Sequence, residues 1–139
     1  MRYIVDWHIH SKYSRACSSQ LELPMIASWC ARKGIDIVAT GDWTHPEWFA
    51  HIKENLVEER QGIYRLKTTA TPSSSPLGRG RTGNGTEFML VQEVSQIYKK
   101  GDKTRRIHNL IFSPSLETCE KVIKELNRLG FNLKSDGRP

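Results

Sequence analysis

The chain has 139 residues, a length typical of one domain, and its hydrophobic content of 37% is enough for an ordinary core. Lysine and arginine outnumber aspartate and glutamate by 21 to 15, and the formal charge of +6 suits a polyanionic partner such as nucleic acid about as well as it suits a merely soluble basic protein. The three cysteines are widely spaced and form no CxxC pair, which argues against a zinc ribbon or a disulfide framework and favours reduced thiols in a cytoplasmic protein.

The first forty residues alternate strands with a helix. A short run of apolar, β-prone residues predicts a buried strand over residues 3–7, and it leaves no long apolar stretch for a signal peptide or a membrane span. After a polar loop, apolar spacing predicts a helix over residues 21–33, with Pro24 in its first turn and Gly34 at its end. Residues 35–40 are predicted to form a second apolar strand. This order predicts a parallel sheet covered by helices.

The later elements combine two helices with strands that lie close together in sequence. Apolar side chains at helical spacing predict a helix over residues 46–59, and a short β-like segment follows at residues 63–66. Strands over residues 88–98 and 105–112 are joined by a tight turn, which predicts a hairpin beside the parallel strands. An amphipathic helix is predicted over residues 115–129.

Two segments carry no regular pattern. Residues 68–86 consist almost wholly of threonine, serine, proline, glycine and arginine, so we expect a flexible insertion there. Residues 132–139 follow the last predicted helix without a further strand. Since a closed barrel of βα units needs roughly 200 residues or more, we expect the chain to be the N-terminal part of a longer domain.

A carboxylate and two imidazoles lie at the end of the first predicted strand. Side chains alternate along a strand, so Asp6, His8 and His10 are expected to point to one side. Two imidazoles at this spacing can bind one divalent ion, and a nearby carboxylate can orient a ring through its second nitrogen. Two surface histidines at a strand end are the simpler alternative, and this motif alone does not exclude it.

Four further residues extend this pattern. Asp42 and His45 follow the second predicted strand, Glu93 lies within an apolar strand, and His108 occupies the middle of the last strand. Enzymes built as βα barrels collect their active sites at the ends of strands. Together these residues predict a metal site.

Each of these residues also has a structural alternative. Asp42 could stabilise the N-terminus of the next helix, and His108 could be a hydrogen-bonded core histidine. Glu93 could pair with Arg65 or Arg106. Jointly the alternatives need several unrelated coincidences on successive strands, so the metal interpretation is favoured.

These motifs together resemble the first half of a PHP (polymerase and histidinol phosphatase) domain. The motifs are Asp6-x-His8-x-His10-Ser11, Thr40-Gly41-Asp42, Glu93 on a later strand, and Arg106-Ile107-His108-Asn109-Leu110. Within that superfamily the sequence is most similar to the endonuclease Q family of DNA repair nucleases, which nick DNA beside deaminated bases. The stretches that carry this similarity are residues 8–16, 23–34, 40–49, 103–110 and 132–139.

The resemblance implies an α/β fold, namely the N-terminal part of a distorted (β/α)7 barrel. It also implies two or three divalent ions, commonly zinc or manganese, at the ends of the strands. On this resemblance His8 and His10 hold the first ion. Glu93 would bridge the two ions, and His108 would bind the second ion.

Some ligands expected from the resemblance are doubtful or lacking. Asp42 and His45 lie where the superfamily places a further ligand, but their motif is stretched, so either residue is a candidate. The ligand that often follows the first histidine pair has no counterpart, because residues 11–20 contain no histidine. The superfamily's later histidine and its terminal Asp-x-His pair also have none.

The implied activity is metal-assisted hydrolysis of phosphodiesters in DNA that carries deaminated bases, without a membrane partner and with an unassigned oligomeric state. As an alternative to DNA binding, the cations at the tip of the predicted hairpin could protect an edge strand from pairing with another chain. A small-molecule phosphatase of the histidinol phosphatase kind and a non-catalytic remnant with half a metal site remain alternatives. The cations predicted to contact the DNA backbone are Lys12, Arg15, Lys103, Arg105 and Arg106.

Overall fold

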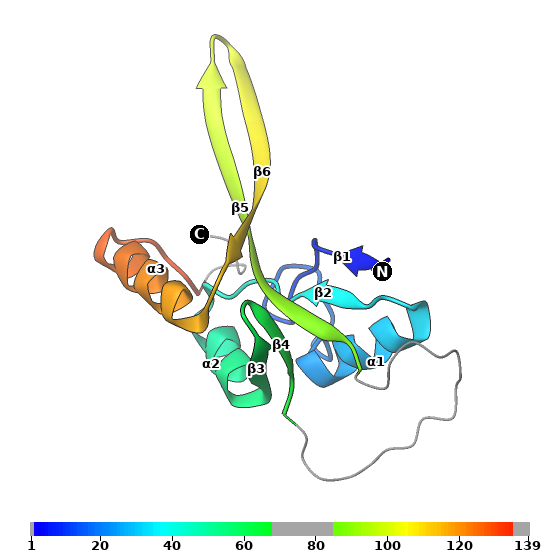
Figure 1. Cartoon of the computed structure of the whole chain (residues 1–139). Coiled ribbons are helices and arrows are strands. Elements are labelled where there is room, and N and C mark those ends of the chain that lie inside the picture. The colour runs from blue at the N-terminus through cyan, green and yellow to red at the C-terminus, as the bar shows by residue number, and fades with distance from the viewer. Residues whose placement is uncertain (1, 68–84, 135–139) are drawn as a thin grey trace.

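The computed structural model describes residues 2–67 and 85–134 of the chain. These residues fold into three helices and a six-stranded sheet, which is a mixed α/β architecture (Figure 1). Most of the predicted insertion, residues 68–84, lies outside the described residues. The elements in chain order are β1 (Val5–Asp6), α1 (Leu23–Lys33), β2 (Ile37–Ala39), α2 (Pro46–Asn55), β3 (Leu56–Arg60), β4 (Ile63–Leu66), β5 (Glu87–Lys100), β6 (Lys103–Ser113) and α3 (Leu116–Arg128).

The described strands follow the order β1-β2-β5-β4-β3, and β6 pairs with β5. Strands β1, β2 and β5 are parallel, with Val38 of β2 in register with both Asp6 of β1 and Phe88 of β5. Strands β4 and β3 continue the sheet in antiparallel fashion. The predicted parallel strands and the predicted hairpin are therefore both present. Because parallel strands point the same way, the residues that follow β1 and β2 lie beside the middle of β5.

Strand β5 has 14 residues and pairs with three other strands. Its first residues pair with β2 and β4 in the body of the protein. From Leu90 to Lys100 it pairs with β6 in an unbroken antiparallel register. Past the first residues of this pairing, β5 and β6 extend away from the rest of the protein (Figure 1). We call residues 94–109 the ribbon.

One apolar cluster connects the three helices to the sheet. Trp48 of α2 and Phe88 of β5 are fully buried, and such burial contributes about 1.5–3 kcal/mol for a large apolar side chain. Gly34 ends α1 with a left-handed φ of 73°, as the sequence predicts. The other buried members are Leu23, Ile26, Cys30, Val38, Trp43, Phe49, Ile52, Leu56, Tyr64, Leu90 and Cys119.

Several predicted boundaries were wrong. The helix expected over residues 46–59 ends at Asn55, and Leu56 begins β3 by pairing with Leu66 of β4. Leu56 is buried in this strand, so its apolar character fitted the helical spacing without requiring a helix. The strand expected over residues 3–7 contracts to Val5–Asp6.

The described strands form an open sheet, with β1 and β3 at the two ends of the path. This arrangement does not show the (β/α)7 barrel that the sequence resemblance implies. The longest helix within residues 2–67 and 85–134 is α3, with 13 residues. None of the helices in this part of the chain is both long and apolar enough to cross a membrane.

Candidate metal centre

Glu93 lies on β5 at the point where the ribbon leaves the body. Its side chain is only 2% exposed, yet its carboxylate is surrounded by three imidazoles. The Oε2 atom lies 3.4 Å from Nε2 of His8 and 3.1 Å from Nε2 of His10. The Oε1 atom contacts Nδ1 of His108. One buried carboxylate therefore has histidines on both of its oxygens.

His8 and His10 reach this carboxylate from the segment that follows β1. Their ring centroids are 5.4 Å apart. Trp7, between β1 and His8, packs edge-on against Phe112 of β6, with centroids 5.5 Å apart. This contact ties the end of β1 to the base of the ribbon. The side chains of His8 and His108 are 51% and 45% exposed, so the centre opens to solvent on their side.

Asp42, which is fully buried, contacts the nitrogen of the His10 ring that does not face Glu93. Oδ1 of Asp42 lies 3.0 Å from Nδ1 of His10. Oδ2 accepts hydrogen bonds from the backbone N–H of Ser11 at 2.6 Å and from the hydroxyl of Ser14 at 3.0 Å. An ionised carboxylate only accepts hydrogen bonds, so this geometry places a proton on Nδ1 of His10. Nε2, the atom that faces Glu93, is then the atom that can bind a metal.

The turn that presents Asp42 requires a glycine before it. Gly41 and Asp42 both have positive φ, at 63° and 42°. A Cβ atom on Gly41 would lie 2.5 Å from the carbonyl oxygen of Ile9, which is too close for any side chain. The indole N–H of Trp48 lies 3.1 Å and 3.0 Å from the carbonyl oxygens of Thr40 and Gly41. Helix α2 thus anchors the turn that supports His10.

His45, a predicted metal ligand, lies at the start of α2. It is the N-cap of α2, where its Nδ1 accepts a hydrogen bond from the backbone N–H of Trp48 at 3.4 Å. Its ring stacks on Tyr13 with centroids 4.2 Å apart. Burial lowers the pKa of His45, which favours the neutral ring that this hydrogen bond requires. The described geometry gives no support to direct metal binding by Asp42 or His45, which stays a prediction.

One of the structural alternatives is excluded. His108 is nearly half exposed, so it is not a core histidine. Arg65 pairs with Glu87 and Glu59, and Glu93 contacts three histidines. Asp6 does not orient a histidine ring as expected. Its carboxylate accepts a hydrogen bond from the backbone N–H of His8, and it borders an apolar cavity beside α1.

The atoms around Glu93 suit a divalent cation. Within the described residues, one ligand atom from each of His8, His10 and Glu93 lies within 4.8 Å of the others. Imidazole nitrogen and carboxylate oxygen are usual ligands of zinc and manganese. With Nδ1 of His10 protonated, its Nε2 is an acceptor that lies 3.1 Å from Oε2 of Glu93. Two acceptors at this distance need a proton or a metal ion between them, and the third imidazole on the same carboxylate makes a metal ion the favoured choice.

The predicted DNA-binding cations fall into two groups. Lys12 lies in the loop after His10 and forms an ion pair with Glu22 at 2.6 Å, a hydrogen bond that raises the pKa of Lys12. Arg15 is exposed in the same loop. Lys103, Arg105 and Arg106 are exposed on β6, in the ribbon. Only the second group is carried by the same two strands as Glu93 and His108.

Sequence patterns missed the supporting residues of the centre. Ser11 and Ser14 are not metal-ligand types, and the sequence motifs assign neither of them a role in the centre. The useful signal is a hydroxyl four residues after His10, together with a glycine directly before Asp42. Neither pattern is specific until the fold brings the two segments together.

Comparison with known proteins identifies relatives that are longer than this chain. No family model matches the sequence. The uncharacterized protein MJ0043 of Methanocaldococcus jannaschii is 27% identical over 135 residues, which cover 97% of this chain and 13% of that protein.

Two solved structures share the fold. One is endonuclease Q in complex with a 27-mer duplex substrate with an abasic lesion at the active site; it gives a TM-score of 0.72 at 27% identity and covers 99% of this chain and 29% of that chain. The other is the lesion-specific endonuclease PfuEndoQ of Pyrococcus furiosus, with a TM-score of 0.72, 26% identity and coverage of 99% and 28%.

These comparisons support a relation to endonuclease Q in both sequence and fold. This chain spans less than a third of the length of either solved relative. The similarity therefore concerns one part of those enzymes, the part that in this chain contains the cluster around Glu93.

Proposed function

We propose that this chain provides part of the active site of a metal-dependent endonuclease of the endonuclease Q type, which incises DNA beside deaminated bases. The observation that supports this proposal best is the cluster of His8, His10 and His108 around buried Glu93, in a chain that resembles endonuclease Q along 99% of its length. The same residues fit the PHP type of phosphoesterase that the sequence motifs suggest.

The two oxygens of Glu93 suggest two neighbouring ions, with zinc or manganese as the candidates. Oε2 faces His8 and His10, and Oε1 faces His108. A carboxylate with different imidazoles on its two oxygens is suited to bridge a pair of ions. We therefore assign His8 and His10 to one ion, His108 to the other, and Glu93 to both.

The protein's own groups have defined tasks in this proposal. Bound divalent ions would polarise the scissile phosphate and lower the pKa of a coordinated water towards neutrality. Asp42 keeps the His10 ring in the tautomer and orientation that present Nε2 to Glu93. The exposed edges of His8 and His108 leave one side of the centre open to a phosphate group.

The test compares DNA cleavage with phosphomonoester hydrolysis. The protein is incubated, with and without manganese or zinc, with duplexes that contain deoxyuridine or deoxyinosine, with a matched undamaged duplex and with histidinol phosphate. We expect metal-dependent nicking beside the lesion, and Glu93→Gln should abolish it. Nicking of neither damaged duplex, together with turnover of histidinol phosphate, would replace the proposal with a small-molecule phosphatase.

A further inference from the structure

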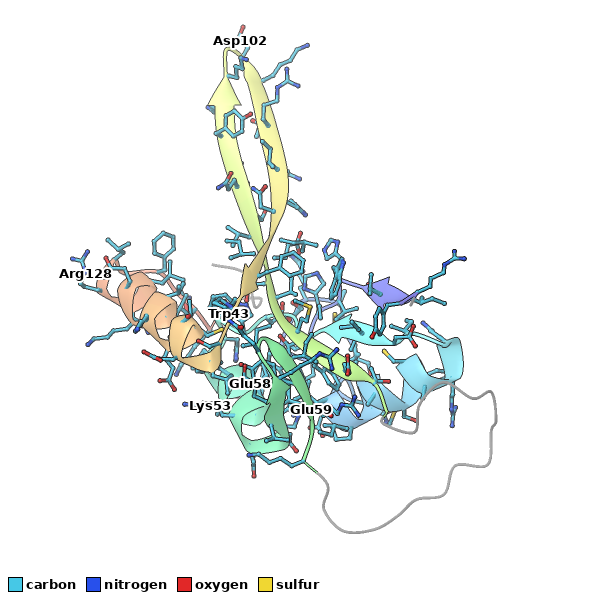
Figure 2. All side chains as sticks on the ribbon, in the orientation of Figure 1. Trp43, Lys53, Glu58, Glu59, Asp102 and Arg128 are labelled. Carbon is cyan, nitrogen blue, oxygen red and sulfur yellow. The ribbon has the colours of Figure 1, made fainter. Side chains whose placement is uncertain are left out.

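The ribbon holds most of the excess positive charge of the protein. Residues 94–109 contain five cations and one carboxylate, a net +4 out of the formal +6 of the whole chain. Figure 2 shows side chains projecting from both sides of the two strands, with Asp102 at the tip. The five cations are Lys99, Lys100, Lys103, Arg105 and Arg106.

The pairing of β5 with β6 sorts these cations into two rows. Ser95 is opposite His108, and Ile97 is opposite Arg106. Because side chains alternate along a strand, Lys99 and Arg106 continue the row that begins with Glu93 and His108. We call this the metal-side row. The opposite row contains Lys100, Lys103 and Arg105.

The metal-side row extends a defined distance from the centre. Six residues separate Glu93 from Lys99, and a strand rises about 3.3 Å per residue, so the row covers about 20 Å. Duplex DNA rises about 3.4 Å per base pair, so this length corresponds to about six base pairs. The right-handed twist of the strands makes the row wind, as a DNA backbone also winds.

Exposed apolar side chains on both faces of the ribbon also indicate a partner. Ile97, in the metal-side row, is 64% exposed, and Tyr98 and Ile107 in the opposite row are exposed as well. A two-stranded hairpin without a packed face is only marginally stable in water. Edge protection accounts for charged side chains on the two strands, but it does not require Lys99 and Arg106 to continue the row of Glu93 and His108. A polyanion that lies along the ribbon and begins at the metal centre matches both the charge and the position.

We propose that Lys99 and Arg106 bind phosphates of duplex DNA about four to six base pairs to one side of the metal centre, so that the ribbon contacts a single flank of the incision site. This inference rests on the proposed function, because it requires DNA at the centre. It specifies that the protein binds one flank of the incision site and how many base pairs of that flank it contacts. The metal cluster alone gives neither.

The test measures binding in EDTA, where metal-dependent cleavage is suppressed. The probe is a fluorescein-labelled duplex of about 24 base pairs with one central deoxyuridine, and affinity is followed by anisotropy at several salt concentrations. The variant K99Q/R106Q removes two cations from the metal-side row. Its matched control, K100Q/R105Q, removes two cations from the adjacent positions of the same strands but from the opposite row.

We expect K99Q/R106Q to weaken binding roughly tenfold at moderate salt and to reduce the salt slope by about two, while K100Q/R105Q has the smaller effect. Trimming the duplex to about three base pairs on one flank should abolish the difference between wild type and K99Q/R106Q, and trimming the other flank should leave it intact. Equal effects of the two variants, or equal effects of trimming either flank, would overturn the proposal. Circular dichroism and melting temperature check that both variants keep the fold.

The outcomes separate this inference from the proposed function. Nicking of damaged DNA with equal behaviour of the two variants refutes the role of the metal-side row and leaves the endonuclease standing. A row-specific, flank-specific loss of binding without nicking supports the ribbon contact and refutes the nuclease. A wild-type protein that does not bind the duplex at all refutes both.

Discussion

Strand β5 carries two buried glutamates whose surroundings differ. Glu87, at the start of the strand, accepts two hydrogen bonds of 2.7 Å from Arg60 and one of 2.7 Å from Arg65. Glu93, six residues later, faces His8, His10 and His108. Both residues are less than 10% exposed, so burial alone does not distinguish them.

The partners decide what each carboxylate can do. A guanidinium is always charged and cannot act as a metal ligand, so Glu87 is committed to its two arginines and serves the fold. An imidazole has a lone pair that binds metals. The atoms around Glu93 can therefore exchange their mutual contacts for contacts to a cation. A buried glutamate among histidines is the stronger sign of function, and the four predictions below test this distinction.

The largest effect is expected at Glu93. Glu93→Gln removes the charged group shared by all three imidazoles, so zinc or manganese affinity should fall at least about 100-fold in isothermal titration calorimetry. Without metal, the variant should keep the fold in circular dichroism, because glutamine has the same shape and its amide can still hydrogen-bond the imidazoles. Glu87→Gln is the matched control and should keep its metal affinity. Equal loss of metal in the two variants would contradict the distinction.

A smaller effect is expected at Asp42, which touches His10 rather than the open side of the centre. Asp42→Asn should lower metal affinity about 10- to 100-fold, because the amide oxygen would stay with the N–H of Ser11 and the amide NH2 would then face Nδ1, which favours the other tautomer of His10. Nitrogen chemical shifts of His10 should show a changed tautomer. Ser14→Ala, which deletes one hydrogen bond to Asp42, should cost less. A loss as complete as that of Glu93→Gln would instead identify Asp42 as a direct ligand.

Glu87 should affect stability and not metal binding. Glu87→Gln replaces three charge-assisted hydrogen bonds with weaker ones and should reduce the free energy of unfolding by about 1–2 kcal/mol in urea denaturation. Glu117→Gln is the control, because Glu117 belongs to an exposed pair with Lys121 on α3 and should change stability barely measurably. No destabilisation by Glu87→Gln would show that the arginine pairs contribute nothing to the fold.

The smallest effect is the pH dependence of the Glu87 contribution. Hydrogen bonds from Arg60 and then Arg65 hold the pKa of Glu87 below its ordinary value of 4.5. A carboxylate with a lowered pKa in the folded protein stabilises the fold above its unfolded pKa, and this contribution disappears as the pH falls through the folded pKa. The stability difference between wild type and Glu87→Gln should therefore be full at neutral pH and shrink below about pH 4.5. A difference that stays constant under acid would refute the linkage.

The parts predicted well from sequence have strong local signals. Gly34 ends α1, and the short turn after Lys100 fixes the hairpin. Glu93 stood out because a charge within an apolar strand needs a partner. His108 follows on the paired strand, so the hairpin itself brings these two residues to the same face.

The parts predicted poorly depend on contacts between distant segments. Leu56 fits a helix face as well as a buried strand position, and only its pairing with Leu66 decides between them. The position of Asp42 depends on an approach between residues 32 positions apart, which no local spacing reveals. A carboxylate after a strand suggests a metal ligand, a helix terminus or a support for a ring, and sequence alone cannot choose among these.

Gly41 sets a condition for transplanting this centre into another protein scaffold. A graft that copies only the histidines and Glu93 would reproduce the ligands without the empty space at position 41, where any added methyl group would meet the carbonyl of Ile9. The smallest unit that can be transplanted is therefore the two contacting segments 8–14 and 40–42, together with the part of β5 and β6 that carries Glu93 and His108. A designer who counted only coordinating atoms would omit the one residue that contributes by having no side chain.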